Sequence, residues 1–445
     1  MKVRLIFFAL VLIILGLVIG SCFNKDSTIM VGGIQVNEAD QTTWTNTLKK
    51  AGFNTVEVTV YAMQGDWDSD NFWFHEKDTA IATEIRAAKA EGLNVVLILR
   101  LAADHAYPNN KFLWHGMIMP KDRKTLESWF AKYAIYLDFW SKFAEKEGVD
   151  VLGIGSEMNV LTTTIQIDSL LPLEEFYLND TTQLEYNKRF LYFKNQIPHE
   201  HLWVGGKEKY TSVKKYLTDR SETQKKWAEQ TCFYKENDSL NKVNSRAAFL
   251  DEKWRELIAK TRQTYSGKLT YAANFDNYQY VSFWDDLDFI GINAYFKLKD
   301  IDKETSEEVF TNSWMEILDT ITSFKKQHDF TQPVLFTELG YTYKNNCTVE
   351  PWNSHGFSVL GEDSTDYKLY IWGNEPDNYK ERILAVKSLR KAIEVTNFDF
   401  AGALYWKFST HDYHKEEAFM LHVSEEMTDS LQDELVKFAI LPLAR

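Results

Sequence analysis

Cysteine is scarce in this chain: Cys22, Cys232 and Cys347 are the only three in 445 residues. Their wide spacing differs from that of the Cys and His clusters that hold structural zinc, which excludes a closed Cys-rich metal site. Cys232 and Cys347 could form a disulfide bridge in an oxidising compartment, although their spacing does not show whether they lie close together.

Basic residues are outnumbered, since 50 Lys and Arg stand against 64 Asp and Glu and the formal charge is -14. A negative protein repels phosphate backbones, which makes nucleic acid an unsuitable partner. The sequence also has no internal repeat and no low-complexity linker that would mark a second domain. With 44% hydrophobic residues it is typical of a globular protein, and we expect a monomer.

The apolar run from Leu5 to Gly20 is shorter than the roughly 18 to 20 residues that a membrane-spanning helix needs. Lys2 and Arg4 precede it, and small residues lead to Cys22, which is the pattern of a secretory signal peptide. Small residues directly before a Cys resemble a bacterial lipoprotein signal, whose cleavage leaves an acylated Cys as the first residue. An uncleaved anchor is the alternative.

These features predict a signal peptide over residues 1–21, lipid on Cys22 and a short tether over residues 22–28. Both readings of the N-terminus hold the body of the protein at a membrane, outside the cytoplasm. We therefore expect a lipid-anchored protein of the cell envelope.

From residue 29 onward, β-rich apolar segments alternate with amphipathic helical stretches. Strands are expected to begin near Ile29, Asn54, Asn94, Asp150, Leu269, Asp288, Pro333 and Phe400. Helices are expected over Thr43–Ala51, Asp78–Glu91, Leu126–Glu147, Phe249–Tyr265, Ser313–His328, Tyr379–Thr396 and Ser430–Phe438. Eight such strands favour one α/β domain over residues 29–445, a (β/α)8 TIM barrel rather than an open sheet.

Residues 160–245 interrupt this alternation with a large insertion that is rich in charged and aromatic residues. The insertion follows the fourth strand, and loops at the carboxyl ends of barrel strands form the face that carries active sites. It therefore either forms a wall of a cleft on that face or is a peripheral addition; the sequence leaves both open.

Two carboxylic acids end strands of the predicted barrel. Glu157 follows the apolar fourth strand, and Glu338 ends the seventh. Hydrolysis of a glycosidic bond needs one acid to protonate the leaving oxygen and one carboxylate to attack or to activate water. Burial and the neighbouring carboxylate are expected to raise the pKa of Glu157, which suits a proton donor. This chemistry requires no cofactor and no metal.

Other residues at the same rim suit a sugar site. Tyr295 ends strand six and could hold the oxygen of Glu338, while Trp406 ends strand eight and could stack against a sugar ring. Arg100 or His105, at the end of strand three, could bind sugar hydroxyls or lower the pKa of a carboxylate. Further candidate substrate-binding residues are Trp114, Asn159, Asn274 and Asn293.

Several motifs together resemble one family. They are Trp114-His-Gly116, Gly153-Ile-Gly-Ser-Glu157-Met, Trp254-Arg-Glu-Leu-Ile, Leu269 to Asn274, Asp288 to Tyr295, Phe336 to Tyr341 and Gly402 to Trp406. The chain resembles the retaining (β/α)8 glycoside hydrolases with catalytic acids on strands four and seven. More narrowly it is similar to glycoside hydrolase family 113, whose characterised members are β-mannanases.

This resemblance implies that Glu157 is the acid/base, Glu338 the nucleophile, Tyr295 its hydrogen-bond partner and Trp406 the sugar platform. The sequence also departs from the wider group. Ser156 stands where an Asn is common, and Leu99 to His105 replaces an expected Lys-Pro-His-like run. These differences leave the catalytic pair intact but bear on the substrate.

Two other functions remain open at this point. A hydrolase scaffold could serve as a non-catalytic carbohydrate-binding lipoprotein, although both acids are present. A metal hydrolase could use His411 and His414, or His199 and His201, but no third ligand follows from the sequence.

Overall fold

The computed structural model describes residues 29–35, 38–76, 79–104, 106–107, 110, 114–120, 123–162, 191, 206–212, 215, 218–219, 222, 239–300, 303–352, 376–411, 417–427 and 429–441. The expected signal peptide and tether, with Cys22, lie outside these residues. So do Cys232, His105 and most of the expected insertion over residues 160–245. The remaining cysteine of the chain, Cys347, is buried and has no disulfide partner among the residues that the structure describes.

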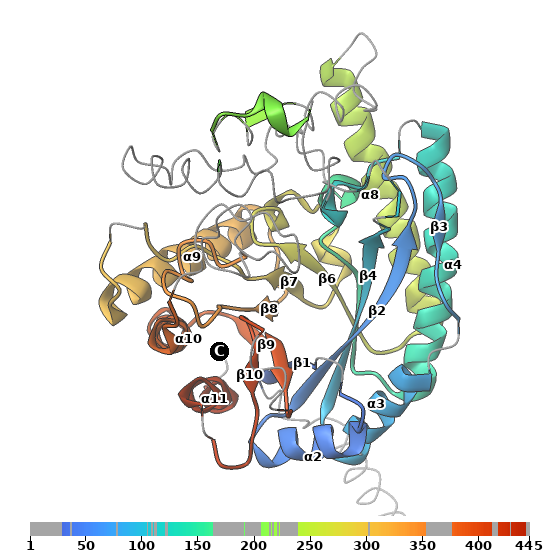
Figure 1. The fold of residues 1–445 in the computed structure, drawn as a ribbon. Helices are drawn as coiled ribbons and strands as arrows, with labels where there is room; N and C mark the ends of the chain where they lie inside the picture. The colour runs from blue at the N-terminus through green and yellow to red at the C-terminus, as the bar shows by residue number, and fades with distance from the viewer. Residues whose placement is uncertain are drawn as a thin grey trace, which may run out of the picture.

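Eight parallel strands form a closed barrel (Figure 1). They are β1 (Met30–Gln35), β2 (Thr55–Gln64), β4 (Asn94–Ala103), β5 (Val151–Ser156), β6 (Lys268–Asn274), β7 (Ile290–Asn293), β8 (Val334–Leu339) and β9 (Phe400–Ser409). Each pairs with the next in this order, and β1 pairs with β9 to close the barrel. The predicted TIM barrel is confirmed.

Two short strands extend the sheet without altering the barrel. β3 (Phe72–Trp73) pairs antiparallel with β2, and β10 (Leu421–His422) pairs parallel with β9. Two residues are too few to produce a hydrophobic pattern, so the sequence did not predict them.

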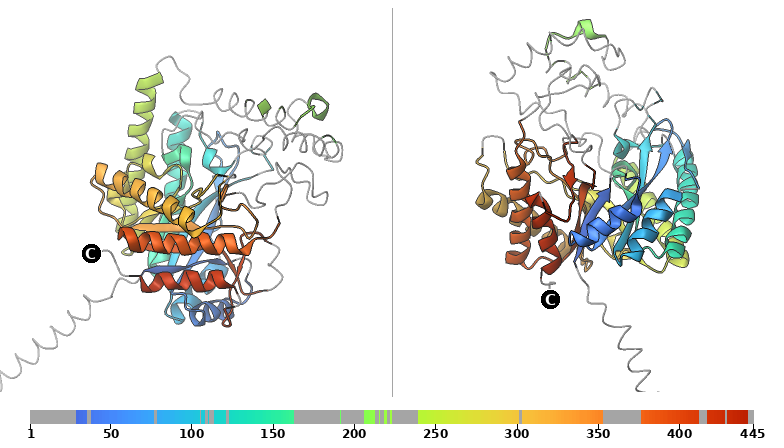
Figure 2. Two further views of the ribbon diagram at one scale, coloured as in Figure 1. Left: turned by 90° about the vertical axis from the view of Figure 1, so that its left-hand side faces the viewer. Right: turned by 60° about the horizontal axis from the view of Figure 1, so that its bottom comes forward.

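Helices surround the barrel (Figures 1 and 2). They are α2 (Gln41–Lys50), α3 (Thr79–Ala90), α4 (Arg123–Glu147), α5 (Asn159–Thr162), α8 (Ser239–Thr264), α9 (Glu307–Gln327), α10 (Tyr379–Thr396) and α11 (Ser430–Val436). Short 3-10 helices are η2 (His115–Met117), η5 (Lys207–Lys209), η7 (Tyr278–Tyr280), η8 (Trp284–Asp286) and η10 (Lys437–Ile440). None of the helices in the described ranges is long and apolar enough to cross a membrane.

Alternation along the strands separates two hydrophobic cores. On β4, Leu97 and Leu99 belong to the large core between the strands and the helices, whereas Val96 and Ile98 belong to a smaller cluster inside the barrel. Leu335 and Leu404 join that inner cluster from β8 and β9. Because side chains alternate along a strand, polar residues in the inward register of the same strands are directed into the barrel.

Candidate active site

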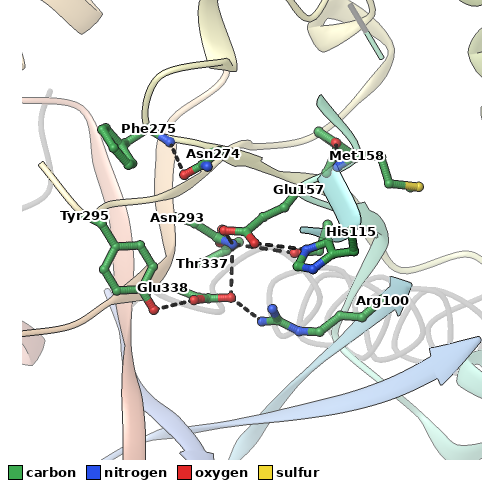
Figure 3. A network of polar contacts seen from close by, with 12 residues as sticks. Arg100, His115, Glu157, Met158, Asn274, Phe275, Asn293, Tyr295, Thr337 and Glu338 are labelled. Atoms are coloured by element: carbon green, nitrogen blue, oxygen red, sulfur yellow. Dashed lines mark hydrogen bonds and ion pairs between the residues drawn. The ribbon is translucent and has the colours of Figure 1, made fainter. Parts of the chain in front are cut away.

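Polar side chains occupy the inward register near the carboxyl ends of the strands. Arg100 continues the inward series of Val96 and Ile98 on β4. Asn293 ends β7, Glu338 lies next to the end of β8, and Glu157 directly follows β5. The side chains of these residues meet in one hydrogen-bonded network (Figure 3).

Glu157 and Glu338 both contact the side chain of Asn293. Its Nδ2 donates to Oε1 of Glu157 at 2.9 Å and to Oε1 of Glu338 at 3.0 Å. Because one nitrogen reaches both oxygens, the sum of these distances sets an upper limit of 5.9 Å between the two oxygens. Both carboxylates are buried, with 9% and 3% of Glu157 and Glu338 exposed. The two acids converge on one site.

An irregularity in β8 directs two consecutive residues toward Asn293. Thr337 Oγ1 donates to Oδ1 of Asn293 at 2.8 Å, while Glu338 accepts from Nδ2. Strict alternation would send Thr337 and Glu338 to opposite faces of the strand. The register of β8 shifts against β9 between Phe336 and Leu339, and a bulge of this kind re-aims a side chain.

Glu338 is held from opposite sides by Arg100 and Tyr295 (Figure 3). Arg100 Nη2 lies 2.5 Å from Oε1 of Glu338, and Tyr295 Oη donates to Oε2 at 2.5 Å. The Arg100 guanidinium also lies over the ring of Trp406, 5.0 Å from its centroid. With Asn293, three donors fix the orientation of this carboxylate.

Glu157 has an unusual backbone conformation, with φ of +50°. Left-handed backbone is uncommon for residues other than glycine and often marks a functional position. Its N–H donates to the carbonyl of Ala272 at 2.8 Å, and the next N–H, of Met158, donates to Tyr271 Oη at 2.8 Å. His115 Nε2 lies 3.1 Å from Oε2 of Glu157, so the carboxylate has a partner on each oxygen.

The pKa values of the two acids are shifted in opposite directions. Burial raises the pKa of Glu338, and the charge of Glu157 adds to this effect while Arg100 opposes it. Burial also acts to raise the pKa of Glu157, but the hydrogen bond and charge of His115, helped by Asn293 and Arg100, hold that pKa below its usual range. The raised pKa predicted for Glu157 is therefore wrong in direction, because that reasoning leaves out His115.

The two tryptophans predicted to bind substrate lie on different sides of the network. Trp406 is half-buried near the end of β9, against Arg100. Trp114 is half-buried just before η2, and its ring centroid lies 5.0 Å from that of His115. Each ring is thus in contact with a side chain that touches one of the two acids.

The predicted asparagines differ in their surroundings. Asn293 is the bridge between the acids, whereas Oδ1 of Asn274 accepts the N–H of Phe275 at 3.0 Å (Figure 3). Asn159 is buried at the first residue of α5, and burial raises the pKa of the nearby Asp276 while the hydrogen bond from Asn159 opposes that rise. His105 lies outside the described residues, so its role stays a prediction.

Three residues of the network were not predicted from the sequence. His115 stands inside the Trp114–Gly116 motif, so the motif itself was the signal. Glu57 accepts a hydrogen bond from Arg100 Nη2 at 3.2 Å, and a Glu between Val56 and Val58 in an apolar strand indicates a polar side chain directed into the barrel. Thr337 gave no signal, because its contact depends on the bulge in β8.

Among the described residues, no group of three or more His, Cys, Asp and Glu side chains could hold a metal ion. His411, a candidate ligand from the sequence, instead pairs with Glu38, with His411 Nε2 3.1 Å from a Glu38 carboxylate oxygen. His414, His199 and His201 lie outside the described residues.

Comparison with solved structures supports the fold. The GH113 β-mannanase AaManA from Alicyclobacillus acidocaldarius, in complex with ManMIm, superposes with a TM-score of 0.58 and 14% identity, over 94% of this chain and 99% of that chain. A complex structure of a GH113 β-1,4-mannanase gives a TM-score of 0.55 and 16% identity, over 93% and 98% of the two chains. At such identities the likeness shows the fold alone. No curated protein is a significant match.

The family assignment comes from the sequence of the chain as a whole. Residues 31–166 and 187–370 match the family model of Glycoside Hydrolase Family 113. These two ranges include every described residue of the acid network from Arg100 to Glu338, and they cover well over half of the chain. The chain belongs to glycoside hydrolase family 113.

Proposed function

We propose that this protein is a retaining β-glycosidase that cleaves β-1,4-linked mannan. The observation that carries the proposal is the Asn293 bridge, which limits the separation of the two acid oxygens to 5.9 Å. Retaining enzymes keep their two carboxyl groups about 5 to 5.5 Å apart, whereas inverting enzymes need about 6.5 to 9.5 Å to admit a water molecule. The limit favours direct attack by one carboxylate.

In the first step, the Glu338 carboxylate forms a bond to the anomeric carbon as the bond from that carbon to the glycosidic oxygen breaks. Glu157 gives its proton to that oxygen, so the leaving sugar departs as an alcohol. Arg100 and Tyr295 hold the two oxygens of Glu338 and fix its direction of attack. The product of this step is a glycosyl ester of Glu338.

In the second step, Glu157 is ionised and takes a proton from water as the water oxygen attacks the anomeric carbon and releases Glu338. His115 favours the ionised form of Glu157, which is the form that this step needs. For the first step the proton must lie on Glu157, and the 3.1 Å contact with His115 is short enough to share one proton between the two groups.

Mannan is the proposed substrate because two solved structures of similar fold are named as β-mannanases. The half-buried ring of Trp406 beside the acid pair supplies an apolar face suited to a sugar ring. We test the substrate with a panel of β-mannan, glucomannan, xylan and β-glucan, with analysis of the products. Cleavage confined to xylan or β-glucan would contradict the mannan assignment.

Stereochemistry and azide rescue test the two roles. The proton NMR signal of the first product should be that of the β-anomer, as retention requires. With an activated aryl glycoside and azide, a Glu338→Ala variant should give the α-azide, because azide replaces the missing nucleophile. A Glu157→Ala variant should give the β-azide, because azide attacks the glycosyl ester of Glu338 and the ester bond breaks. The opposite pattern would exchange the roles, and a non-catalytic binding protein would show no turnover in any of these assays.

The N-terminal sequence supports a lipid anchor on Cys22 at the outer side of a membrane. The basic residues Lys2 and Arg4, the apolar run and the small residues before Cys22 are the basis for this part of the proposal. A Cys22→Ala variant should lose incorporation of labelled fatty acid. Equal labelling of both proteins would contradict lipidation at Cys22.

A further inference from the structure

Glu57 is a buried acid that the two-step mechanism leaves unused. It is 1% exposed and lies in the inward register of β2, between Val56 and Val58, which pack in the core under the helices. An ionisable side chain in an apolar interior is costly unless other groups satisfy it. Its contacts therefore indicate what it does.

One nitrogen of Arg100 joins Glu57 to Glu338. Nη2 donates to Oε1 of Glu57 at 3.2 Å and lies 2.5 Å from Oε1 of Glu338. Since Nη2 carries two hydrogens, one can point to each acid. Nε of Arg100 has no hydrogen-bond partner among the described residues, so the contacts of Nη2 and the Trp406 ring contribute more to holding the guanidinium.

The pKa of Glu57 is raised to about 8, because burial, together with the charge of Glu338, outweighs the opposing effect of Arg100. The charged and titratable groups that act on Glu57 are Arg100 on β4 and Glu338 on β8, and Tyr61 on β2 is coupled to it. With such a pKa, Glu57 is mostly uncharged at neutral pH, so Arg100 has Glu338 as its anionic partner. Ionised Glu57 would compete for the same cation.

We propose that Glu57 is a positioning residue, whose carboxyl group orients Arg100 so that the guanidinium holds Glu338 in its attacking position. This inference rests on the proposed function, in which Glu338 is the nucleophile. When Glu338 becomes an ester it loses its charge, and Glu57 remains as a polar contact for Arg100. Glu57 thus acts on the reaction through Arg100 and does not touch the sugar.

Two substitutions separate this role from simple packing. Glu57→Gln keeps an oxygen that accepts from Arg100 but does not ionise, whereas Glu57→Ala removes the acceptor. Glu84→Gln is the matched control, because Glu84 is also a buried acid and accepts hydrogen bonds from Trp44 and Gln35, away from the acid network. Circular dichroism and the melting temperature establish that each variant is folded.

The probe is 2,4-dinitrophenyl β-mannobioside, or the same aryl glycoside of another sugar if the wild type cleaves that sugar instead. Dinitrophenolate leaves without protonation, so kcat/KM reports attack by Glu338 and not the proton on Glu157. At neutral pH, Glu57→Gln should retain kcat/KM within about threefold, whereas Glu57→Ala should lose about 10- to 100-fold, mainly in kcat. The control should match the wild type.

The pH profile is the decisive readout. The wild type should lose kcat/KM at alkaline pH as Glu57 ionises and draws Arg100 away from Glu338, and Glu57→Gln should lack this loss. Identical profiles, or a Gln variant as impaired as the Ala variant, would overturn the inference. If Glu57→Ala does not fold, the profile of Glu57→Gln decides alone. A wild type that cleaves no glycoside overturns the proposed function as well, whereas an active wild type with unchanged variants overturns only the role of Glu57.

Discussion

His115 Nε2 lies 3.1 Å from Oε2 of Glu157, and this contact holds the pKa of Glu157 below its usual range against the effect of burial. Removal of His115 should therefore raise the pKa of Glu157. Since Glu157 must be protonated to cleave a natural glycosidic bond, the alkaline limb of kcat/KM should move to higher pH in His115→Ala. The measurement is a pH profile on a β-1,4-manno-oligosaccharide.

The same substitution at His328, an exposed residue that stacks on Phe330 outside the acid network, is the control and should leave the profile in place. A limb that stays fixed or moves to lower pH in His115→Ala would contradict the assigned effect of His115.

Tyr295 donates to Oε2 of Glu338, and this hydrogen bond lowers the pKa of that acid. Tyr295→Phe should raise the pKa of Glu338, so that the acidic limb of kcat/KM moves to higher pH. Loss of one donor to the reacting carboxylate should reduce kcat by about 10- to 100-fold. Kinetics of the purified variant on mannan measure both effects.

Tyr341→Phe offers a matched comparison, because Tyr341 is also buried and donates to the backbone carbonyl of Phe296 rather than to an acid. We expect wild-type kcat from it. A Tyr295→Phe variant as active as Tyr341→Phe would show that the contact with Glu338 does not matter for attack.

Thr337 sets which way the Asn293 amide faces, since its hydroxyl donates to Oδ1 and leaves Nδ2 for the two acids. Thr337→Val keeps the shape but removes this donor, so the amide loses its fixed orientation. We expect kcat on mannan to fall about tenfold, with little change in KM.

Thr311→Val is the control for replacing a buried hydroxyl with a methyl group, because the hydroxyl of Thr311 has no hydrogen-bond partner in the described part of the chain. It should be neutral for kcat. Equal kcat in the two variants would remove Thr337 from the positioning network.

Leu97 and Arg100 share β4 but face opposite sides of it, so their substitutions should have different effects. Leu97 is fully buried against the helices, and Leu97→Ala should lower the free energy of unfolding by about 2 to 5 kcal/mol. Folded Leu97→Ala should keep its kcat, because the site lies on the other face. Urea unfolding followed by kinetics below the transition checks this, and a large loss of kcat in folded protein would contradict it.

The barrel was predictable because its strands are short apolar runs that recur between helical stretches. The first residues of the helices were less predictable from the sequence. α8 begins at Ser239, ten residues before its predicted start at Phe249, and six of the ten residues between are polar, so the weak apolar spacing of Leu240, Val243 and Ala247 was not recognised as helical. α9 begins six residues early, at Glu307, where Ser306 caps it by accepting the N–H of Val309. That Ser-Glu-Glu sequence is a start signal that periodicity alone does not use.

Four site residues were predicted because each ends or follows an apolar strand: Glu157, Glu338, Asn293 and Tyr295. Partners that reach the site from elsewhere in the fold could not be predicted from the sequence. His115 reaches Glu157 from η2, and no spacing rule joins a loop after β4 to a residue after β5. The opposite pKa shifts of the two acids follow from such partners, which explains why burial alone gave the wrong direction for Glu157.

At residue 157, the left-handed backbone makes glycine the residue that favours stability, whereas catalysis requires a glutamate. Glycine adopts this conformation freely, while an ordinary L-residue held there costs about 1 to 3 kcal/mol. Variants chosen only for thermal resistance should therefore drift toward glycine at this position and lose their acid catalyst as they gain stability. A glutamate at residue 157 therefore indicates selection for catalysis at the expense of stability.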